Sequence, residues 1–222
     1  MKGYQEIFEA AEQARIQGDY DLAIALYAIA AASNEEISTA NKTTLHHMWG
    51  VALLGTNDYA GANQHFELAL DTVQYLDQHA AILRDCSRGD MINEDFERAL
   101  EIIEVSLSIT RRTNLAELGA SLGFKARILL AQANVTEALE LFGTADVLLQ
   151  RSDNRHYELY NLLHFLKAII EHRLSLEGCN GERDFARAQT PRLQALAETY
   201  GGLHHQKMAA DIIADVFTEA KA

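Results

Sequence analysis

A phrase that recurs four times constrains the fold of this chain more than any other feature of its sequence. Each copy has a short polar turn, an aromatic or apolar residue, an alanine three residues later, and then large and small residues at helical spacing. The landmark alanines are Ala23, Ala62, Ala99 and Ala138, which lie 39, 37 and 39 residues apart. A period of this length is typical of stacked helical hairpins, in which each hairpin buries its apolar face against the next.

The residues of the phrase have separate physical roles. Polar residues at the turn can cap the second helix of each hairpin, and we assign this role to Asp19, to Asn57 or Asp58, to Asn93 and to Asn134. Asn134 and Glu137 also have the spacing of a capping box. A large residue four positions after each alanine can fill the space between neighbouring helices. These large residues are Tyr27, Phe66, Ile103 and Phe142.

The first copy, Gly18-Asp19-Tyr20-x-x-Ala23-x-x-x-Tyr27-x-x-Ala30, resembles the second helix of a tetratricopeptide (TPR) repeat. In that family the first helix carries a small residue twelve positions before the alanine. Counting back gives Ala11, Gly50, Ser87 and Ala126, all of them small. The spacing exceeds the usual period of about 34 residues and is closer to that of longer-hairpin members, which include intracellular peptide receptors and cargo adaptors.

This resemblance implies an all-α fold, an α-solenoid of about five TPR-like hairpins with a C-terminal capping helix, wound into a right-handed superhelix. We expect a single domain over residues 1–222. The predicted hairpins are 3–34, 37–75, 77–111, 113–150 and 153–200, and the capping helix is 203–220. The fifth hairpin is irregular, because Thr190-Pro191 has the pattern of a helix start. Its second helix is therefore either kinked there or begins at Thr190.

Composition limits the partners and the compartment. The formal net charge is −13, whereas a nucleic-acid-binding protein needs a positive face to neutralise phosphates. We therefore predict no direct binding to nucleic acid or to membranes. The N-terminus becomes acidic at once and lacks the apolar stretch of a secretory signal, so we expect a cytoplasmic protein. In that compartment Cys86 and Cys179 should be free thiols.

The candidate binding residues follow from the resemblance. In TPR proteins the first helices line the concave surface, which places His47, Arg84, Arg88 and Arg127 toward the groove. A guanidinium is suited to capturing a carboxylate, so we predict a positive patch that binds an acidic group of the partner. The alternative is that Arg84 and Arg88 pair locally with Asp85, Asp90 or Asp95.

Four more residues on the long fifth first helix could extend this groove. Aromatic and amide groups are well suited to ordering an extended peptide. These residues are Tyr157, Tyr160, Asn161 and His164. The alternative is that the tyrosines pack on the neighbouring hairpin.

Signals for catalysis and for metals are weak. Gly119-Ala120-Ser121-Leu122-Gly123 fits the GxSxG pattern, but that motif needs a strand before a sharp turn, and here it lies in a predicted helix. The adjacent pair His46-His47 points in directions about 100° apart on a helix. We predict no catalytic residue, no cofactor and no metal site.

The leading functional hypothesis is a scaffold or adaptor that binds a protein or peptide in its concave groove. Two alternatives remain. One is a regulatory protein that responds to a ligand or peptide, and the other is a module that assembles with copies of itself into a homo-oligomer. An enzyme is the least favoured class.

Overall fold

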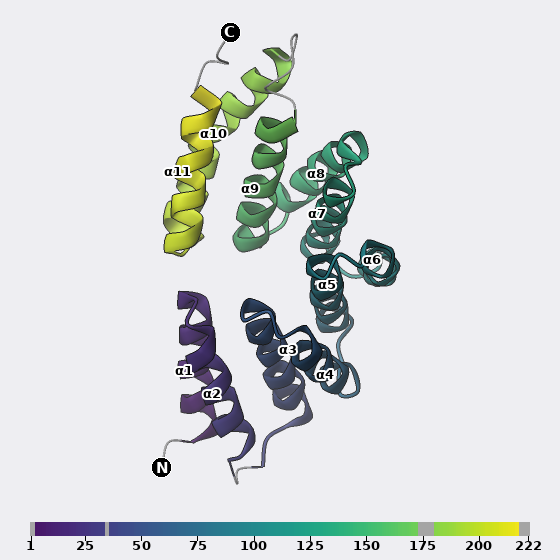
Figure 1. Ribbon diagram of the computed structural model, residues 1–222, viewed down its shortest axis with the longest axis vertical. Coiled ribbons are helices and arrows are strands. Elements are labelled where there is room, and N and C mark those ends of the chain that lie inside the picture. Colours follow the sequence, from purple (N-terminus) through teal and green to yellow (C-terminus); the bar gives the residue numbers. More distant parts are fainter. Residues whose placement is uncertain (1–2, 34–35, 173–179, 218–222) are drawn as a thin grey trace. The chain divides into compact units, whose positions relative to one another are not determined.

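The computed structural model describes residues 3–33, 36–172 and 180–217. Over these ranges the chain is built of eleven α-helices without a β-strand (Figure 1). It forms two compact units, residues 1–109 and 110–222, which are described separately below. The helices of the first unit are α1 (Tyr4–Gln17), α2 (Tyr20–Ala31), α3 (Thr39–Gly55), α4 (Tyr59–Leu70), α5 (Leu76–Ile92) and α6 (Phe96–Thr110), whose last residue reaches the second unit. The helices of the second unit are α7 (Leu115–Ala131), α8 (Val135–Gln150), α9 (Arg155–His172), α10 (Asn180–Tyr200) and α11 (Leu203–Phe217).

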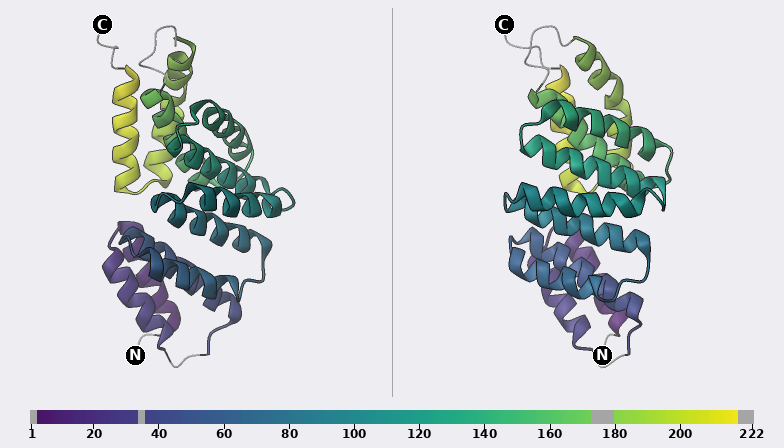
Figure 2. Two further views of the ribbon diagram at one scale, coloured as in Figure 1. Left: turned by 45° about the vertical axis from the view of Figure 1, so that its right-hand side comes forward. Right: turned by 90° about the vertical axis from the view of Figure 1, so that its right-hand side faces the viewer.

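Consecutive helices pair as hairpins, as the repeat predicts. α1 packs on α2, α3 on α4, and α7 on α8 (Figures 1 and 2). In the α5–α6 hairpin, the hydroxyl of Ser87 donates to the carbonyl of Ala99 at 2.7 Å. The hydroxyl of Ser106 donates to the carbonyl of Ala80 at 3.0 Å. The small residues of the repeat thus join the two helices through buried hydrogen bonds as well as through close approach.

The same turn joins the two helices of the first four hairpins. One residue of each turn has a left-handed backbone, with φ of 83° at Gly18, 63° at Asn57, 62° at Glu94 and 61° at Ala133. Glycine and asparagine tolerate this conformation, whereas a residue such as glutamate or alanine adopts it at a cost of about 1–2 kcal/mol. The stacked hairpins therefore impose the turn even where the local sequence disfavours it.

The helix caps confirm two of the predicted residues and correct two others. The carboxylates of Asp19 and Asp58 accept hydrogen bonds from the backbone N–H groups of Leu22 and Gly61. Asn93 ends α5, and Asp95 accepts from the N–H of Arg98 instead, because the left-handed residue of this turn is Glu94.

Asn134 does occupy the N-cap position of α8, but its side chain caps no backbone group. It donates to the carboxylate of Glu137 at 2.8 Å. The predicted capping box is therefore wrong. The side chains of Asn134 and Glu137 bond each other instead of the backbone N–H groups at the start of α8.

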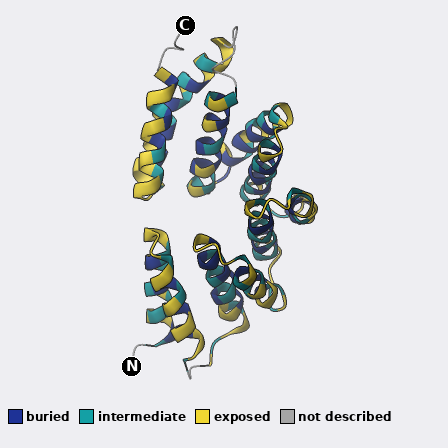
Figure 3. Cartoon of the chain, in the orientation of Figure 1, coloured by how far each residue is buried: buried dark blue, intermediate teal, exposed yellow. Residues whose placement is uncertain are grey.

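The predicted register is confirmed by burial. The landmark alanines and the large residues that follow them are essentially inaccessible to solvent, at 0 or 1% exposure. In Figure 3 buried and exposed residues alternate along the helices that are seen from the side. At Gly50 an added Cβ would lie 2.6 Å from the ring of Phe66, which explains why this copy has glycine at the small position. Large and small side chains therefore interlock between the helices of a hairpin.

Replacing Ala138 by phenylalanine should overpack this interface. Ala138 lies on α8 with 0% exposure, and inserting a large side chain into such a contact typically costs about 1–3 kcal/mol. Thermal unfolding followed by circular dichroism should show a lower melting temperature. Thr136→Phe, at an exposed position of the same helix, is the control and should unfold close to the wild-type temperature. Equal melting temperatures for the two variants would contradict the assigned register.

The second helix of the fifth hairpin runs through Thr190, so of the two alternatives left open a start at Thr190 is excluded. α10 begins at Asn180 and runs through Pro191 to Tyr200. Proline removes the N–H that would bond to the carbonyl of Arg187 four residues earlier. The hydroxyl of Thr190 donates to that carbonyl at 2.9 Å and replaces the missing bond. The C-terminal helix α11 packs on α9 and α10, as expected of a capping helix.

The structure bears on the predicted free cysteines and on the predicted lack of membrane binding. Cys86 has a free thiol, and burial raises its pKa to about 12. Cys179 lies outside the described residues. Within those residues no helix combines the length and the apolar character that a bilayer span requires.

Candidate binding site

In the first unit, two predicted groove residues meet at an aspartate. The Nε2 atom of His47 on α3 lies 2.8 Å from Oδ2 of Asp85 on α5. Burial raises the pKa of Asp85, but the guanidinium of Arg88, the hydrogen bond with His47 and the charge of Arg84 outweigh burial and hold the pKa below its usual range. Asp85 is therefore a partly buried carboxylate that links two neighbouring first helices.

Arg88 is the least satisfied cation of this cluster. Its Nη2 atom lies 3.5 Å from Oδ1 of Asp85, which is long for an ion pair, and its side chain is 29% exposed. Its Nε–H is buried and has no hydrogen-bond partner among the described residues. Because native proteins pair most buried donors, this guanidinium keeps the capacity to bind a further acceptor.

The predicted alternative of local pairing is therefore realised, but incompletely. Arg88 pairs with Asp85, while Asp90 is paired with Arg98 of α6 through a contact of 3.4 Å. Arg84 is partly buried. We refer to His47, Arg84, Asp85 and Arg88 as the α3–α5 cluster. The sequence indicated that Asp85 could pair with Arg88, because residues three apart on a helix lie on the same face.

The second unit holds the remaining predicted residues. The guanidinium carbon of Arg127 on α7 lies 5.0 Å from the ring centroid of Phe124. Burial, followed by the charges of Arg127, Lys167 and His205, lowers the pKa of His164 on α9 well below its usual value. Arg84 and Arg88 belong to the first unit and Arg127 to the second, so the three-arginine patch remains a prediction.

The other residues of α9 face different surroundings. The hydroxyl of Tyr157 donates to a carboxylate oxygen of Glu117 on α7 at 3.0 Å. Asn161 is buried, and its amide donates to the carbonyl of Phe142 on α8 at 3.3 Å. Tyr160 is 46% exposed, and its ring meets that of His205 edge-on at 4.7 Å. Asn161 thus holds helices together, whereas Tyr160 is accessible to a partner.

A pocket of about 640 Å³ lies in the second unit, where α7 and α9 begin and α10 ends. This volume falls in the range of small-ligand pockets, about 300–1,000 Å³. Its lining includes Asn114, Glu117, Asp153, Arg155, His156 and Tyr200. The sequence reading did not find this pocket, although Asn114 and Asn154 each cap a helix that borders it.

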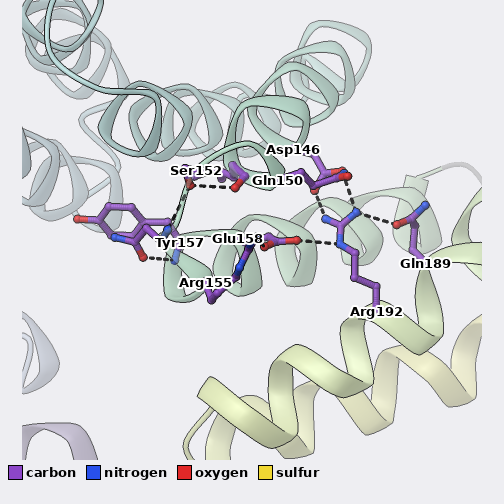
Figure 4. A network of polar contacts seen from close by, with 10 residues as sticks. Asp146, Gln150, Ser152, Arg155, Tyr157, Glu158, Gln189 and Arg192 are labelled. Atoms are coloured by element: carbon purple, nitrogen blue, oxygen red, sulfur yellow. Dashed lines mark hydrogen bonds and ion pairs between the residues drawn. The ribbon is translucent and has the colours of Figure 1, made fainter.

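A network of ion pairs supports the wall of this pocket (Figure 4). Arg192 of α10 lies between Asp146 of α8 and Glu158 of α9, with its Nε 3.1 Å from Oε1 of Glu158 and its terminal nitrogens against both oxygens of Asp146. Arg155, which lines the pocket, pairs with the other oxygen of Glu158 at 2.5 Å. Three helices of the second unit are thereby fixed by one guanidinium.

Ser121 of the GxSxG pattern lies in a helix, as the sequence predicts. This residue lies in the middle of α7 and is fully buried. No strand precedes it among the described residues. The GxSxG pattern is therefore part of a packed helix.

Comparison with known proteins gives structural relatives only. No protein-family model matches the sequence, and no curated protein matches it. A Rap protein solved in complex with the competence and sporulation factor superposes with a TM-score of 0.74 at 13% identity, over 97% of this chain and 66% of the Rap chain. This chain thus spans slightly less than two thirds of that protein.

Two other solved structures are similar over most of this chain. The TPR-like repeats of a kinesin light chain from Podosopora anserina superpose with a TM-score of 0.57 at 19% identity, over 91% of this chain and all of that one. A signal transduction ATPase with a TPR sensor, from Pyrococcus horikoshii, superposes with a TM-score of 0.68 at 12% identity, over 95% of this chain and 32% of that one. With its helical hairpins, confirmed repeat register and these structural relatives, the chain has the tetratricopeptide-like α-solenoid fold.

Proposed function

We propose that this chain is a non-catalytic scaffold or adaptor that binds a protein or peptide, and that Arg88 binds an acidic group of that partner. The observation that carries the proposal is the guanidinium of Arg88, which has one long ion pair and a buried Nε–H with no partner in the part of the chain that the structure describes. A carboxylate accepts two parallel hydrogen bonds from a guanidinium and would satisfy it. Arg84, whose charge also acts on Asp85, would add positive charge to this cluster.

The pocket of the second unit supports binding in a different way. Its walls combine the aromatic rings of His156 and Tyr200 with polar groups at the start of two helices. Aromatic side chains contribute much of the contact area in protein interfaces. We propose that this pocket accepts a side chain of the partner. The exposed ring of Tyr160 would also contact the partner.

Substitution of Arg88 by glutamine should weaken binding of an acidic peptide by about tenfold or more, because a hydrogen bond to a charged group contributes about 1.5–3 kcal/mol. Peptides selected from a random display library on the wild-type protein would be measured by fluorescence anisotropy. The free energy of unfolding should fall by only about 1 kcal/mol or less, since His47 still bonds Asp85.

Arg111→Gln is the matched control, because Arg111 is an exposed arginine in the connection after α6. It should leave affinity unchanged. Salt should weaken the wild-type complex, since screening shortens the reach of charges. If Arg88→Gln and Arg111→Gln bind the selected peptides equally well, Arg88 has no role in binding.

The second candidate function, a ligand-responsive regulator, is favoured by the position of Asp85. This carboxylate holds His47 of α3 on one side and Arg88 of α5 on the other. A ligand that binds Arg88 and breaks its ion pair with Asp85 would change the charge around the hydrogen bond between His47 of α3 and Asp85 of α5. Two of the structural relatives are themselves a Rap protein and a TPR sensor.

A further inference from the structure

The α3–α4 hairpin contains a contact between two histidines that the proposed binding function does not use. Nδ1 of His46 on α3 lies 2.9 Å from Nδ1 of His65 on α4, and the ring centroids are 5.2 Å apart. Each Nδ1 lies roughly 1.1 Å from its own centroid by ordinary ring geometry, so the two nitrogens point almost directly at each other. This is the geometry of an N–H···N hydrogen bond, in which one ring donates and the other accepts.

A tryptophan covers this pair. The indole of Trp49 stacks on the ring of His65 with centroids 4.0 Å apart and planes inclined by 24°. It also lies parallel to His46 at 6.4 Å and stacks on Tyr27 of α2 at 6.5 Å. Trp49 is the single tryptophan of the chain. Its emission therefore reports on this cluster alone.

The surroundings of the pair oppose protonation. Burial lowers the pKa of His46, and burial together with the charge of His46 lowers that of His65 to about 4, against an opposing effect of Asp58 at the start of α4. The charged groups nearest the pair along its own helices are Lys42 of α3 and Glu67 of α4. On the packed helices, Glu12 and Arg15 of α1 bond Tyr27 and each other, Asp85 and Arg88 of α5 belong to the α3–α5 cluster, and α5 also carries Asp77, His79 and Arg84.

We propose that the His46–His65 contact is a proton-sensitive latch, which closes the α3–α4 hairpin at neutral pH and releases it in mild acid. One extra proton can be shared between the two rings, because an imidazolium still donates to a neutral imidazole. Two extra protons leave two N–H groups facing each other with no acceptor. Opening of the hairpin therefore takes up protons.

The same atoms argue against a metal ion as the occupant. Two nitrogens at 2.9 Å that point at each other leave no room for an ion between them, since a Zn–N bond measures about 2.0–2.1 Å. In the described residues no third histidine, cysteine or carboxylate completes a ligand set there. The shared proton is the occupant that the geometry fits.

The sign of the pH effect follows from the lowered pKa values. The stabilisation is complete above the unfolded pKa of about 6.5 and is lost as pH falls from there toward 4. Over this window the unfolding equilibrium constant rises by up to about tenfold per pH unit for each proton taken up. The chain has 9 histidines, so the effect must be isolated by comparing variants.

The test is urea unfolding followed by Trp49 emission at pH 7.5 and pH 5.0. His65→Phe keeps a ring against Trp49 and removes the titrating group, and His79→Gln on α5 is the control. Between the two pH values the unfolding constant should rise at least about tenfold more in the wild type than in His65→Phe. It should rise in His79→Gln as in the wild type. Equal pH dependence in wild type and His65→Phe would overturn the latch.

Nuclear magnetic resonance on the unmodified protein tests the latch without a variant. The two imidazoles should titrate well below pH 6.5 and at different pH values, with one Nδ1 protonated at pH 7.5. Ordinary titration of both rings near 6.5 would overturn the proposal.

A zinc titration is a separate test. Saturable binding of equimolar Zn²⁺ that quenches Trp49 in the wild type and not in His65→Phe would also overturn the proposal, since that result would make the pair a metal site.

Discussion

Replacing Arg192 by methionine is expected to lower the free energy of unfolding of the second unit by about 3–5 kcal/mol, the usual cost of leaving a buried charge without its counterion. Asp146 loses its ion pair in this variant, whereas Glu158 keeps its pair with Arg155. Asp146 and Glu158 are only 5% and 3% exposed. They come from α8 and α9, and Arg192 of α10 provides contacts to both. Methionine has a similar length and is apolar, so the variant removes the charge with little change in volume. Urea unfolding followed by circular dichroism would measure the loss.

A matched control lies on α9. Lys167 pairs with Glu171 at 3.6 Å, and both side chains are about half exposed. Lys167→Met removes a cation from a solvated pair and should cost less than about 1 kcal/mol. Similar small losses in both variants would mean that water reaches Asp146 and that Arg192 is not its counterion.

Neutralising Asp146 as well should restore much of the lost stability. In the double variant Asp146→Asn, Arg192→Met no unpaired charge remains buried at this point, because Glu158 keeps its ion pair with Arg155. Removing both members of a buried ion pair is often close to neutral, whereas removing one member is costly. A double variant less stable than Arg192→Met alone would show that Asp146 is held by other groups.

Replacing Phe142 by alanine is expected to lower the free energy of unfolding by about 3–5 kcal/mol, the typical cost of removing a large buried ring. Phe142 is fully buried in the core of the second unit, together with Ala126, Leu162 and Phe165. Its ring stacks on that of Phe165 with centroids 5.8 Å apart. The deletion leaves a cavity, because the helices that line it are held by their own hydrogen bonds and can collapse only in part.

The comparison is Val147→Ala on the same helix, where the side chain is 49% exposed. Its effect should stay within about 0.5–1 kcal/mol. Thermal and urea unfolding of both variants would give the difference. If Phe142→Ala costs no more than Val147→Ala, then the ring does not occupy the interhelical position that the repeat assigns to it.

The helices and their register could be predicted because the repeat fixes which side chains face inward. Alternation of small residues such as Ala126 with large ones such as Phe142 is a local pattern, and it repeats often enough to be recognised. The turns were less predictable. Glu94 and Ala133 adopt a left-handed backbone that their side chains disfavour, and only the stacking of the helices explains it.

The contacts of the candidate site depend on residues distant in sequence. The bond between His47 and Asp85 joins positions 38 residues apart, and the pair of Arg192 and Asp146 joins positions 46 residues apart. Such pairs require the register between different hairpins, which the repeat does not specify to the level of single side chains. The adjacent histidines illustrate the limit. The sequence predicts that the side chains of His46 and His47 point in different directions, but not what each one contacts. His46 contacts α4 and His47 contacts α5.

The shared left-handed turn has a consequence for how such a chain can grow or shrink. Because each of the four turns has its own left-handed residue, at Gly18, Asn57, Glu94 and Ala133, a hairpin that is duplicated carries its own turn with it. A copied segment of about 37–39 residues could therefore be inserted between existing hairpins and continue the stack. The irregular fifth hairpin and α11 would be retained at the end, since they close the apolar face that any number of preceding hairpins leaves open.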